Sequence, residues 1–192
     1  MLFSGKVDEN VQMRLLELRD AKALFALTEQ SRDYLREWLP FVDGTRTVQE
    51  IEGFIQSGLQ KYAFNNGGEL GLWYRGEIAG VLGLHTINWA HRHTSIGYWL
   101  GKRFQGYGIM TNSCRFLIDI LFEEYGLNRV EIRVAPENRK SRAIPERLGF
   151  QNEGRRRQAE WLYDHYVDHI IYGMLADDWS KLHAHNVESS LI

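Results

Sequence analysis

Apolar and polar residues alternate along several short stretches of the chain, which is the pattern of half-buried β-strands. Residues 129–134 show it most clearly, because Val130, Ile132 and Val134 alternate with charged side chains. The same pattern predicts further strands over residues 12–18, 69–74, 78–84, 93–100, 150–155 and 165–174. Residues 75–77 are typical of a hairpin turn, in which Gly76 suits the positive φ that such turns require.

Apolar residues spaced three or four apart predict helices between these strands. Asp20 is expected to cap a helix through residue 28, and Thr47 with Glu50 predicts a capping box at the start of a helix to about residue 62. Residues 106–124 predict a long helix closing near Gly126, and residues 136–147 a short one. A loop over residues 37–41, between the first two helices, carries aromatic side chains.

This order of elements predicts an α/β (α+β) fold with a mixed, largely antiparallel, seven-stranded sheet flanked by helices. No repeat, low-complexity tract or Pro/Gly/Ser-rich linker divides the sequence. We therefore expect a single domain over residues 1–180. The chain is expected to fray after about Trp179, with a C-terminal tail over residues 181–192.

Composition narrows the classes of partner. The 192 residues are 44% apolar and 25% charged, with a formal net charge of -2, as in an ordinary soluble globular protein. Nucleic-acid binders usually carry a basic excess, so we expect no nucleic-acid partner. No stretch approaches the roughly 20 apolar residues that cross a bilayer, which predicts a cytoplasmic protein without a membrane partner.

Cys114 is the lone cysteine, so no intramolecular disulfide is expected. A nucleophilic role competes with a place in the core, because this residue lies on an apolar stripe of helical spacing where cysteine behaves as a small hydrophobe. The stripe consists of Met110, Cys114, Leu117, Ile118, Leu121 and Tyr125. The periodicity favours the core.

The segment from Gly97 to Thr111 predicts a strand that passes through a glycine-containing loop into a helix. The first turn of a helix leaves backbone N–H groups unpaired and carries partial positive charge, so it binds phosphate well. Gly106 and Gly108 would let the backbone approach such an anion closely. A tight strand-to-helix turn without a ligand is the alternative. The segment lacks the Gly-Lys-Ser/Thr of a P-loop and the three glycines of a Rossmann fingerprint.

The spacing Arg103-x-x-Gly106-x-Gly108 resembles the pyrophosphate signature of the GCN5-related N-acetyltransferase (GNAT) superfamily. The resemblance runs from the first strand to about Met174 and implies acetyl-CoA as co-substrate, without a metal. It also implies that the segment beginning at Asn138 is the helix whose Asn contacts the pantetheine arm. The remaining cofactor contacts that it implies come from Tyr98, Trp99, Leu100, Arg103, Phe104, Gln105, Gly106, Tyr107, Gly108 and Ile109.

Three short motifs narrow the resemblance to the branch that acetylates the N-termini of ribosomal proteins. They are Glu37-Trp38-Leu39-Pro40, Gly97-Tyr98-Trp99-Leu100 and Tyr166-Val167-Asp168-His169. On this reading Trp38 and Phe41 line the acceptor groove. An internal anchor that holds the loop against the core is the alternative for both.

The resemblance implies that the fourth and fifth strands splay apart to admit the pantetheine arm. A backbone N–H near Tyr98 or Trp99 then faces the thioester oxygen as an oxyanion hole, and the amine attacks directly. Many superfamily members carry a tyrosine as the acid for the departing thiolate, but the matching residue here is Pro145. A proline should loosen the helix beside Ser141, which becomes the leading proton donor; a serine bonded to its own helix is the alternative.

Glu160 is the candidate base, in a segment expected between the last two strands. Its alternative is a surface carboxylate paired with residues of the Arg155-Arg156-Arg157 run. That run either attracts an acidic protein or is a solvated charge cluster. The spacing of a metal site is missing among His85, His91 and His93. Strand alternation places His165 and His169 on the same strand face, which favours structural roles for both imidazoles over metal binding.

Three functions remain open from the sequence. The first is acetylation of a protein N-terminal α-amine, and the second is acetylation of a small amine such as a polyamine, amino acid or antibiotic. The third, motivated by Pro145, is a non-catalytic acetyl-CoA-binding module. A homodimer or higher homo-oligomer is compatible with all three.

Overall fold

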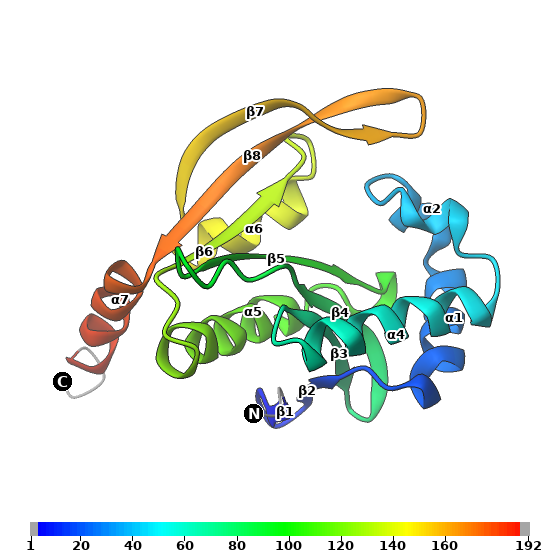
Figure 1. The fold of residues 1–192 in the computed structure, drawn as a ribbon, viewed down its shortest axis with the longest axis horizontal. Coiled ribbons are helices and arrows are strands. Elements are labelled where there is room, and N and C mark those ends of the chain that lie inside the picture. The colour runs from blue at the N-terminus through cyan, green and yellow to red at the C-terminus, as the bar shows by residue number, and fades with distance from the viewer. Residues whose placement is uncertain (1–3, 189–192) are drawn as a thin grey trace.

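The computed structural model describes residues 4–188, which form one mixed sheet with helices on both sides (Figure 1). The eight strands follow the order β1-β2-β3-β4-β5-β6-β8-β7 across the sheet. Their bounds are β1 Ser4–Lys6, β2 Val11–Leu15, β3 Gly68–Tyr74, β4 Glu77–Leu84, β5 His93–Leu100, β6 Arg129–Val134, β7 Gln151–Leu162 and β8 His165–Leu175.

All neighbouring strands pair antiparallel except β5 and β6, which are parallel. The expected mixed, largely antiparallel sheet is therefore confirmed. The additional strand is β1, a three-residue edge strand that is too short to show alternation in the sequence.

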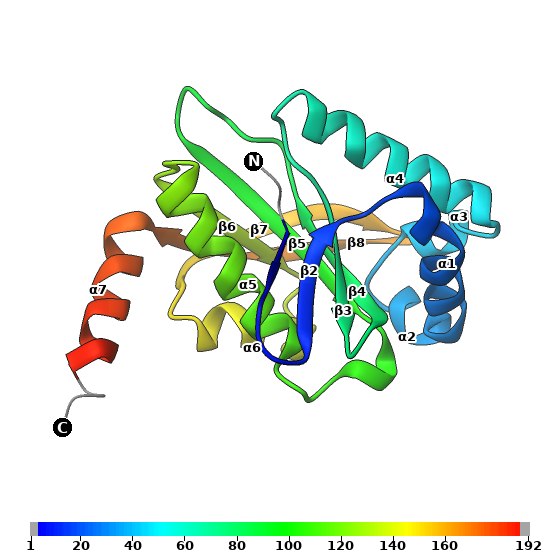
Figure 2. The same ribbon diagram turned by 90° about the horizontal axis from the view of Figure 1, so that it is seen from below.

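Apart from α7, which follows β8 and lies away from the rest, the helices lie in two groups (Figure 2). One group gathers beside β3 and β4, and the other group, α5 and α6, packs against β5 and β6. The helices are α1 Ala21–Gln30, α2 Arg32–Arg36, α3 Phe41–Gly44, α4 Val48–Ala63, α5 Ile109–Asp119, α6 Arg139–Arg147 and α7 Ala176–Glu188. Within residues 4–188, none of them is long and apolar enough to cross a membrane.

The predicted capping box at α4 is confirmed: the N–H of Thr47 donates to Glu50 Oε2 at 2.7 Å, and the N–H of Glu50 donates to Thr47 Oγ1 at 3.4 Å. Asp20 is the N-cap of α1, as predicted, but its side chain makes no capping hydrogen bond to the first turn of that helix. Its carboxylate instead accepts hydrogen bonds from Arg14 and from the N–H of Glu17.

Several predicted boundaries shift. The predicted strand over residues 12–18 ends at Leu15, because Leu18–Asp20 forms a short 3-10 turn. The helix expected over residues 106–124 begins at Ile109 and continues past Asp119 as a π-helical turn, Ile120–Glu124. The helix expected from residue 136 begins at Arg139. Phe41, expected in a loop, begins α3.

The last two strands form a long hairpin that curves above the sheet towards α2 (Figure 1). The strand expected over residues 150–155 continues to Leu162, past a bulge between Arg156 and Glu160. Alternation breaks at this bulge, which is why the sequence pattern ended early. Glu160 accordingly lies within β7 and not in a loop between strands.

Helix α7 crosses the expected boundary between domain and tail at residue 180. Trp179 anchors it: the indole Nε1 donates to Asp119 Oδ1 at 2.7 Å, and the ring lies 6.3 Å from that of Phe122. Residues 189–192 of the expected tail lie outside the described residues.

A single apolar cluster fills the space between the sheet and its helices. Cys114 is fully buried in it, and burial raises the pKa of its thiol, as expected for a core residue and not for a nucleophile.

Asp20→Asn should lower the free energy of unfolding by about 2 kcal/mol at pH 7, because Arg14 would lose its charged partner in a nearly buried site. Desolvation alone would raise the pKa of Asp20, but the hydrogen bonds from Arg14 and from Glu17 outweigh it and hold that pKa below its usual value. The stabilisation is therefore complete above the unfolded-state pKa of about 4 and is lost as the pH falls through the folded-state pKa.

Urea unfolding of the wild-type protein and of Asp20→Asn, at neutral and acidic pH, measures this difference. Glu77→Gln serves as the control, since its ion pair with Arg103 is exposed and its loss should change stability by less than ~0.5 kcal/mol. Equal losses in the two variants would contradict a special role for Asp20.

Candidate active site

The parallel pairing of β5 with β6 stops before the end of both strands. It runs from His93 with Arg129 to Ile96 with Ile132 and goes no further. Beyond this point β5 stays paired with β4, and β6 stays paired with β8. The two strands therefore diverge while each remains held on its outer edge.

The direction of the β5 backbone groups follows from two hydrogen bonds. The N–H of His85 donates to the carbonyl of Ser95, and the N–H of Gly101 donates to the carbonyl of Ala79. Because backbone groups alternate along a strand, the N–H of Trp99 faces β4, whereas the N–H of Tyr98 faces the gap beside β6. Of the two candidates for the oxyanion donor, this alternation favours Tyr98.

A cavity of about 990 Å³ opens beside this gap. Such a volume is at the upper end of small-molecule sites. Eleven residues predicted to bind cofactor, acceptor or reacting groups line it: Trp38, Tyr98, Trp99, Leu100, Phe104, Gln105, Gly106, Gly108, Ile109, Asn138 and Ser141.

The glycine loop has the geometry expected of a phosphate site. Gly106 and Gly108 have φ of +86° and +74°, which non-glycine residues adopt only with strain. Gly108 is the N-cap of α5, so the free N–H groups of the first helical turn point out beside the cavity. The glycine loop is therefore more than a tight turn, because a cavity lies beside it. Its backbone N–H groups suit the pyrophosphate of acetyl-CoA.

Four cationic side chains also line the cavity: Arg115, Arg139, Lys140 and Arg147. Sequence reasoning missed them. Arg115 could have been found, because it follows Gly108 at helical spacing through Thr111 and Asn112. Lys140 Nζ donates to Gln105 Oε1 at 3.1 Å, and Arg147 donates to Thr111 Oγ1 at 3.1 Å, so α6 is joined to the phosphate loop and to α5.

Helix α6 brings two predicted residues to the cavity. Asn138 is its N-cap, and its Oδ1 accepts from the N–H of Ser141 at 3.1 Å. Within residues 4–188 the hydroxyl of Ser141 interacts with Tyr98 on β5 and is not bonded to its own helix. Pro145 lies inside α6 and is buried.

Four predicted residues do not line the cavity. Arg103 pairs with Glu77 and lies over the ring of Phe104. Tyr107 stacks on Tyr74 at 5.5 Å. Phe41 lies beside the cavity-lining Trp99, with ring centroids 6.2 Å apart, and Glu160 lies on the hairpin.

Glu160 is fixed by contacts within the hairpin. Its Oε2 lies 3.1 Å from His169 Nε2. The bulge that precedes it is held by Asp168, which accepts hydrogen bonds from the N–H of Gln158 at 2.7 Å and from Arg155. Arg155 therefore pairs with Asp168, and Glu160 pairs with the imidazole of His169 and not with the arginine run.

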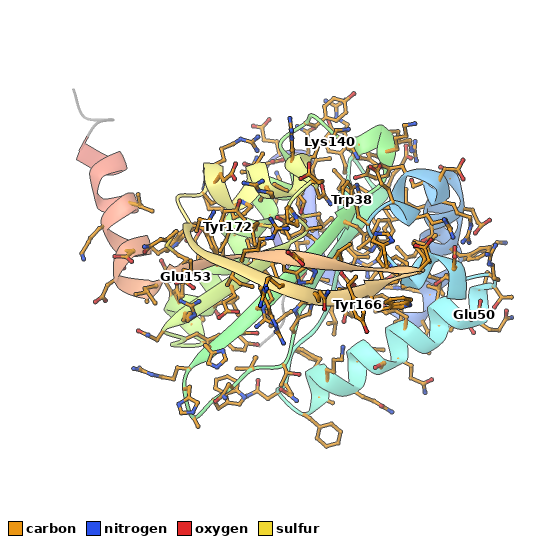
Figure 3. All side chains as sticks on the ribbon, turned by 90° about the horizontal axis from the view of Figure 1, so that it is seen from above. Trp38, Glu50, Lys140, Glu153, Tyr166 and Tyr172 are labelled. Carbon is orange, nitrogen blue, oxygen red and sulfur yellow. The ribbon has the colours of Figure 1, made fainter. Side chains whose placement is uncertain are left out.

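The tip of the hairpin is bonded to the loop before α3. The hydroxyl of Tyr163 donates to the carbonyl of Leu39 at 2.8 Å, and the guanidinium of Arg36 lies 4.2 Å from the Tyr163 ring. Figure 3 shows the hairpin crossing the molecule, with Trp38 and Lys140 along one flank. The segment that carries Glu160 is thus tied to the loop that carries Trp38.

Within residues 4–188, no group of three or more His, Cys, Asp or Glu side chains could hold a metal ion. His91 and His93 stack on each other, and His165 pairs with Asp164.

Residues 10–151 match the profile of the acetyltransferase (GNAT) domain. YdaF of Bacillus subtilis (strain 168), provisionally named a ribosomal N-acetyltransferase, is 40% identical over 179 residues, which cover 93% of this chain and 98% of YdaF. The chain therefore belongs to the GNAT acetyltransferase family.

Two solved structures extend the comparison. The ribosomal L7/L12 α-N-protein acetyltransferase RimL, in complex with coenzyme A, has a TM-score of 0.87 and 25% identity, with 93% of this chain and 99% of that chain covered. The microcin C7 self-immunity acetyltransferase MccE, in complex with acetyl-CoA and AMP, has a TM-score of 0.86 and 29% identity, with coverages of 90% and 96%. The chain is an N-acetyltransferase that uses acetyl-CoA, which removes the non-catalytic alternative.

Asn138→Ala and Asn138→Ser separate the two roles of this residue. Alanine removes the helix cap and should lower the free energy of unfolding by about 1 kcal/mol, whereas serine keeps a capping oxygen and should cost only a few tenths. Both variants lose the amide, so coenzyme A should bind about tenfold more weakly to each, as a lost hydrogen bond of ~1.4 kcal/mol requires. Urea unfolding and titration calorimetry measure the two effects. Undiminished affinity in the serine variant would argue against a pantetheine contact.

Proposed function

We propose that this enzyme acetylates the α-amine of a protein N-terminus, with a ribosomal protein as the acceptor. Support comes from RimL, whose acceptor is the ribosomal protein L7/L12, and from the 25% identical ribosomal-protein-serine acetyltransferase of Escherichia coli (strain K12). The observation in this chain that carries the proposal is the Glu160–His169 pair, on a hairpin bonded through Tyr163 to the Trp38 loop. A ribosomal acceptor would locate the reaction in the cytoplasm.

The acceptor must lose a proton before it attacks. An α-amine with a pKa near ~8 is about one tenth neutral at pH 7, whereas a lysine near ~10.4 is almost fully charged. Glu160 accepts this proton, directly or through a water, and His169 holds its carboxylate in place. A single carboxylate is sufficient for an α-amine.

The neutral amine attacks the thioester carbonyl carbon, and negative charge collects on the carbonyl oxygen. The N–H of Tyr98, facing the gap between β5 and β6, stabilises this charge; one such donor contributes about 3 kcal/mol. The C–N bond then forms fully while the C–S bond breaks. The hydroxyl of Ser141 protonates the departing thiolate and recovers a proton from the nitrogen as the neutral amide forms, while the proton taken up by Glu160 returns to solvent.

A small amine is the second candidate acceptor. It is favoured by MccE, an acetyltransferase whose structure is a complex with both acetyl-CoA and AMP. The two candidates are distinguished by which acceptor is turned over.

Lysine-free peptides with a free N-terminal serine or alanine should be acetylated at least ~10 times faster than N-terminally blocked peptides that contain lysine, because of the difference in amine pKa. Mass spectrometry after incubation with acetyl-CoA identifies the modified peptide. Free amino acids and polyamines are assayed in parallel. Turnover of these amines with unmodified peptides would replace the protein acceptor with a small one.

Glu160→Gln should lower kcat about 100-fold or more near neutral pH, because the amine loses its base. The deficit should shrink at alkaline pH, where the α-amine is already neutral. The matched control is Asp164→Asn in the turn of the same hairpin, where the carboxylate is exposed and pairs only with His165 among the described residues. Initial rates across pH 6 to 10 measure both. A constant deficit at all pH values would point to lost structure instead of a lost base.

A further inference from the structure

Pro145 leaves one carbonyl of α6 without its helical partner. In an α-helix the carbonyl of residue 141 accepts from the N–H of residue 145, and proline has no N–H. Helical bonds flank this position at both ends of α6, since the N–H of Arg142 donates to the carbonyl of Asn138 and that of Leu148 donates to the carbonyl of Ile144. The helix therefore continues on both sides of the missing bond.

The hydroxyl of Tyr98 occupies this vacant position. It donates to the carbonyl of Ser141 at 2.9 Å, across from β5 to α6. Burial raises the pKa of Tyr98 well above its usual value, so the hydroxyl stays protonated and remains a donor. A bond from outside thus replaces the missing bond within the helix.

The geometry points to Tyr98 as a positioning residue that sets the distance between the two groups acting on the thioester. Its own N–H faces the gap where the carbonyl oxygen would lie, and its hydroxyl holds the backbone of Ser141, the candidate proton donor. The pairing of β5 with β6 has already ended here, so this contact takes the place of strand pairing in joining the two sides. This inference rests on the proposed function for its catalytic part only.

A second tyrosine provides an internal comparison. Tyr172 also braces α6, but its hydroxyl bonds the side chains of Arg142 and Glu146, at 2.9 and 2.6 Å, and not a backbone carbonyl. Its role does not depend on the missing N–H at residue 145. The two tyrosines therefore respond differently when that N–H is restored.

The test is a double-mutant cycle of Tyr98→Phe and Pro145→Ala. Tyr98→Phe strands a carbonyl and should lower Tm by ~3–6 °C, kcat about tenfold and coenzyme A affinity about threefold. Pro145→Ala restores an N–H within the helix. The double variant should therefore recover to within about threefold of Pro145→Ala in kcat and within about 1 °C in Tm.

The peptide KM of Tyr98→Phe should stay within about twofold of wild type, because the contact lies on the cofactor side of the site. The control is Tyr172→Phe, whose losses Pro145→Ala should not repair. Melting temperature and coenzyme A affinity are measured without any acceptor, so they report on the brace even if no peptide is acetylated.

Additive losses in the double variant would overturn the inference, as would a Tyr98→Phe enzyme indistinguishable from wild type. Rescue of Tyr172→Phe by Pro145→Ala would also overturn it, since the effect would then be general stabilisation of α6. If Tyr98→Phe does not fold, recovery of folding in the double variant gives the supporting answer, and a double variant that also fails to fold gives the opposing one.

Discussion

The early end of the β5–β6 ladder is the constraint on which the site depends. Buried backbone N–H and C=O groups need partners, and a ladder that stops leaves some of them facing a gap. The gap persists because β5 is held by β4 through Leu100 and β6 is held by β8 through Val134. The gap cannot close by pairing β5 with β6, because each strand is fixed on its outer side. A ligand or water must therefore satisfy the backbone N–H and C=O groups that face the gap.

Helix α6 shows how the chain tolerates this gap. A proline inside a helix ordinarily costs about 3 kcal/mol or more, partly through the lost hydrogen bond. Here the hydrogen bond from Tyr98 replaces the lost bond. Pro145 therefore removes a bond within the helix and leaves a carbonyl that attaches α6 to β5. Together with the Arg147 bond to Thr111, it fixes α6 against both walls of the cavity.

Local patterns predicted much of this fold, and tertiary competition explains where they failed. The box of Thr47 and Glu50 was predictable because both partners lie within one helical turn. Asp20 carried the same signal, but Arg14 on the neighbouring strand captured its carboxylate. The glycine loop was predictable from spacing, whereas the hairpin contact of Tyr163 with Leu39 joins residues 124 positions apart and leaves no local pattern.

The distribution of charge explains why composition alone described the site poorly. A net charge of -2 argues against polyanion binding over the whole surface, yet four cations meet at one cavity. They come from two helices, α5 and α6, which are separated in sequence by β6. Folding therefore concentrates positive potential where a pyrophosphate would lie while leaving the hairpin to supply a carboxylate through Glu160. Glu160 does not line the cavity, and this separation suits cofactor binding, because a carboxylate beside the phosphate loop would repel the pyrophosphate.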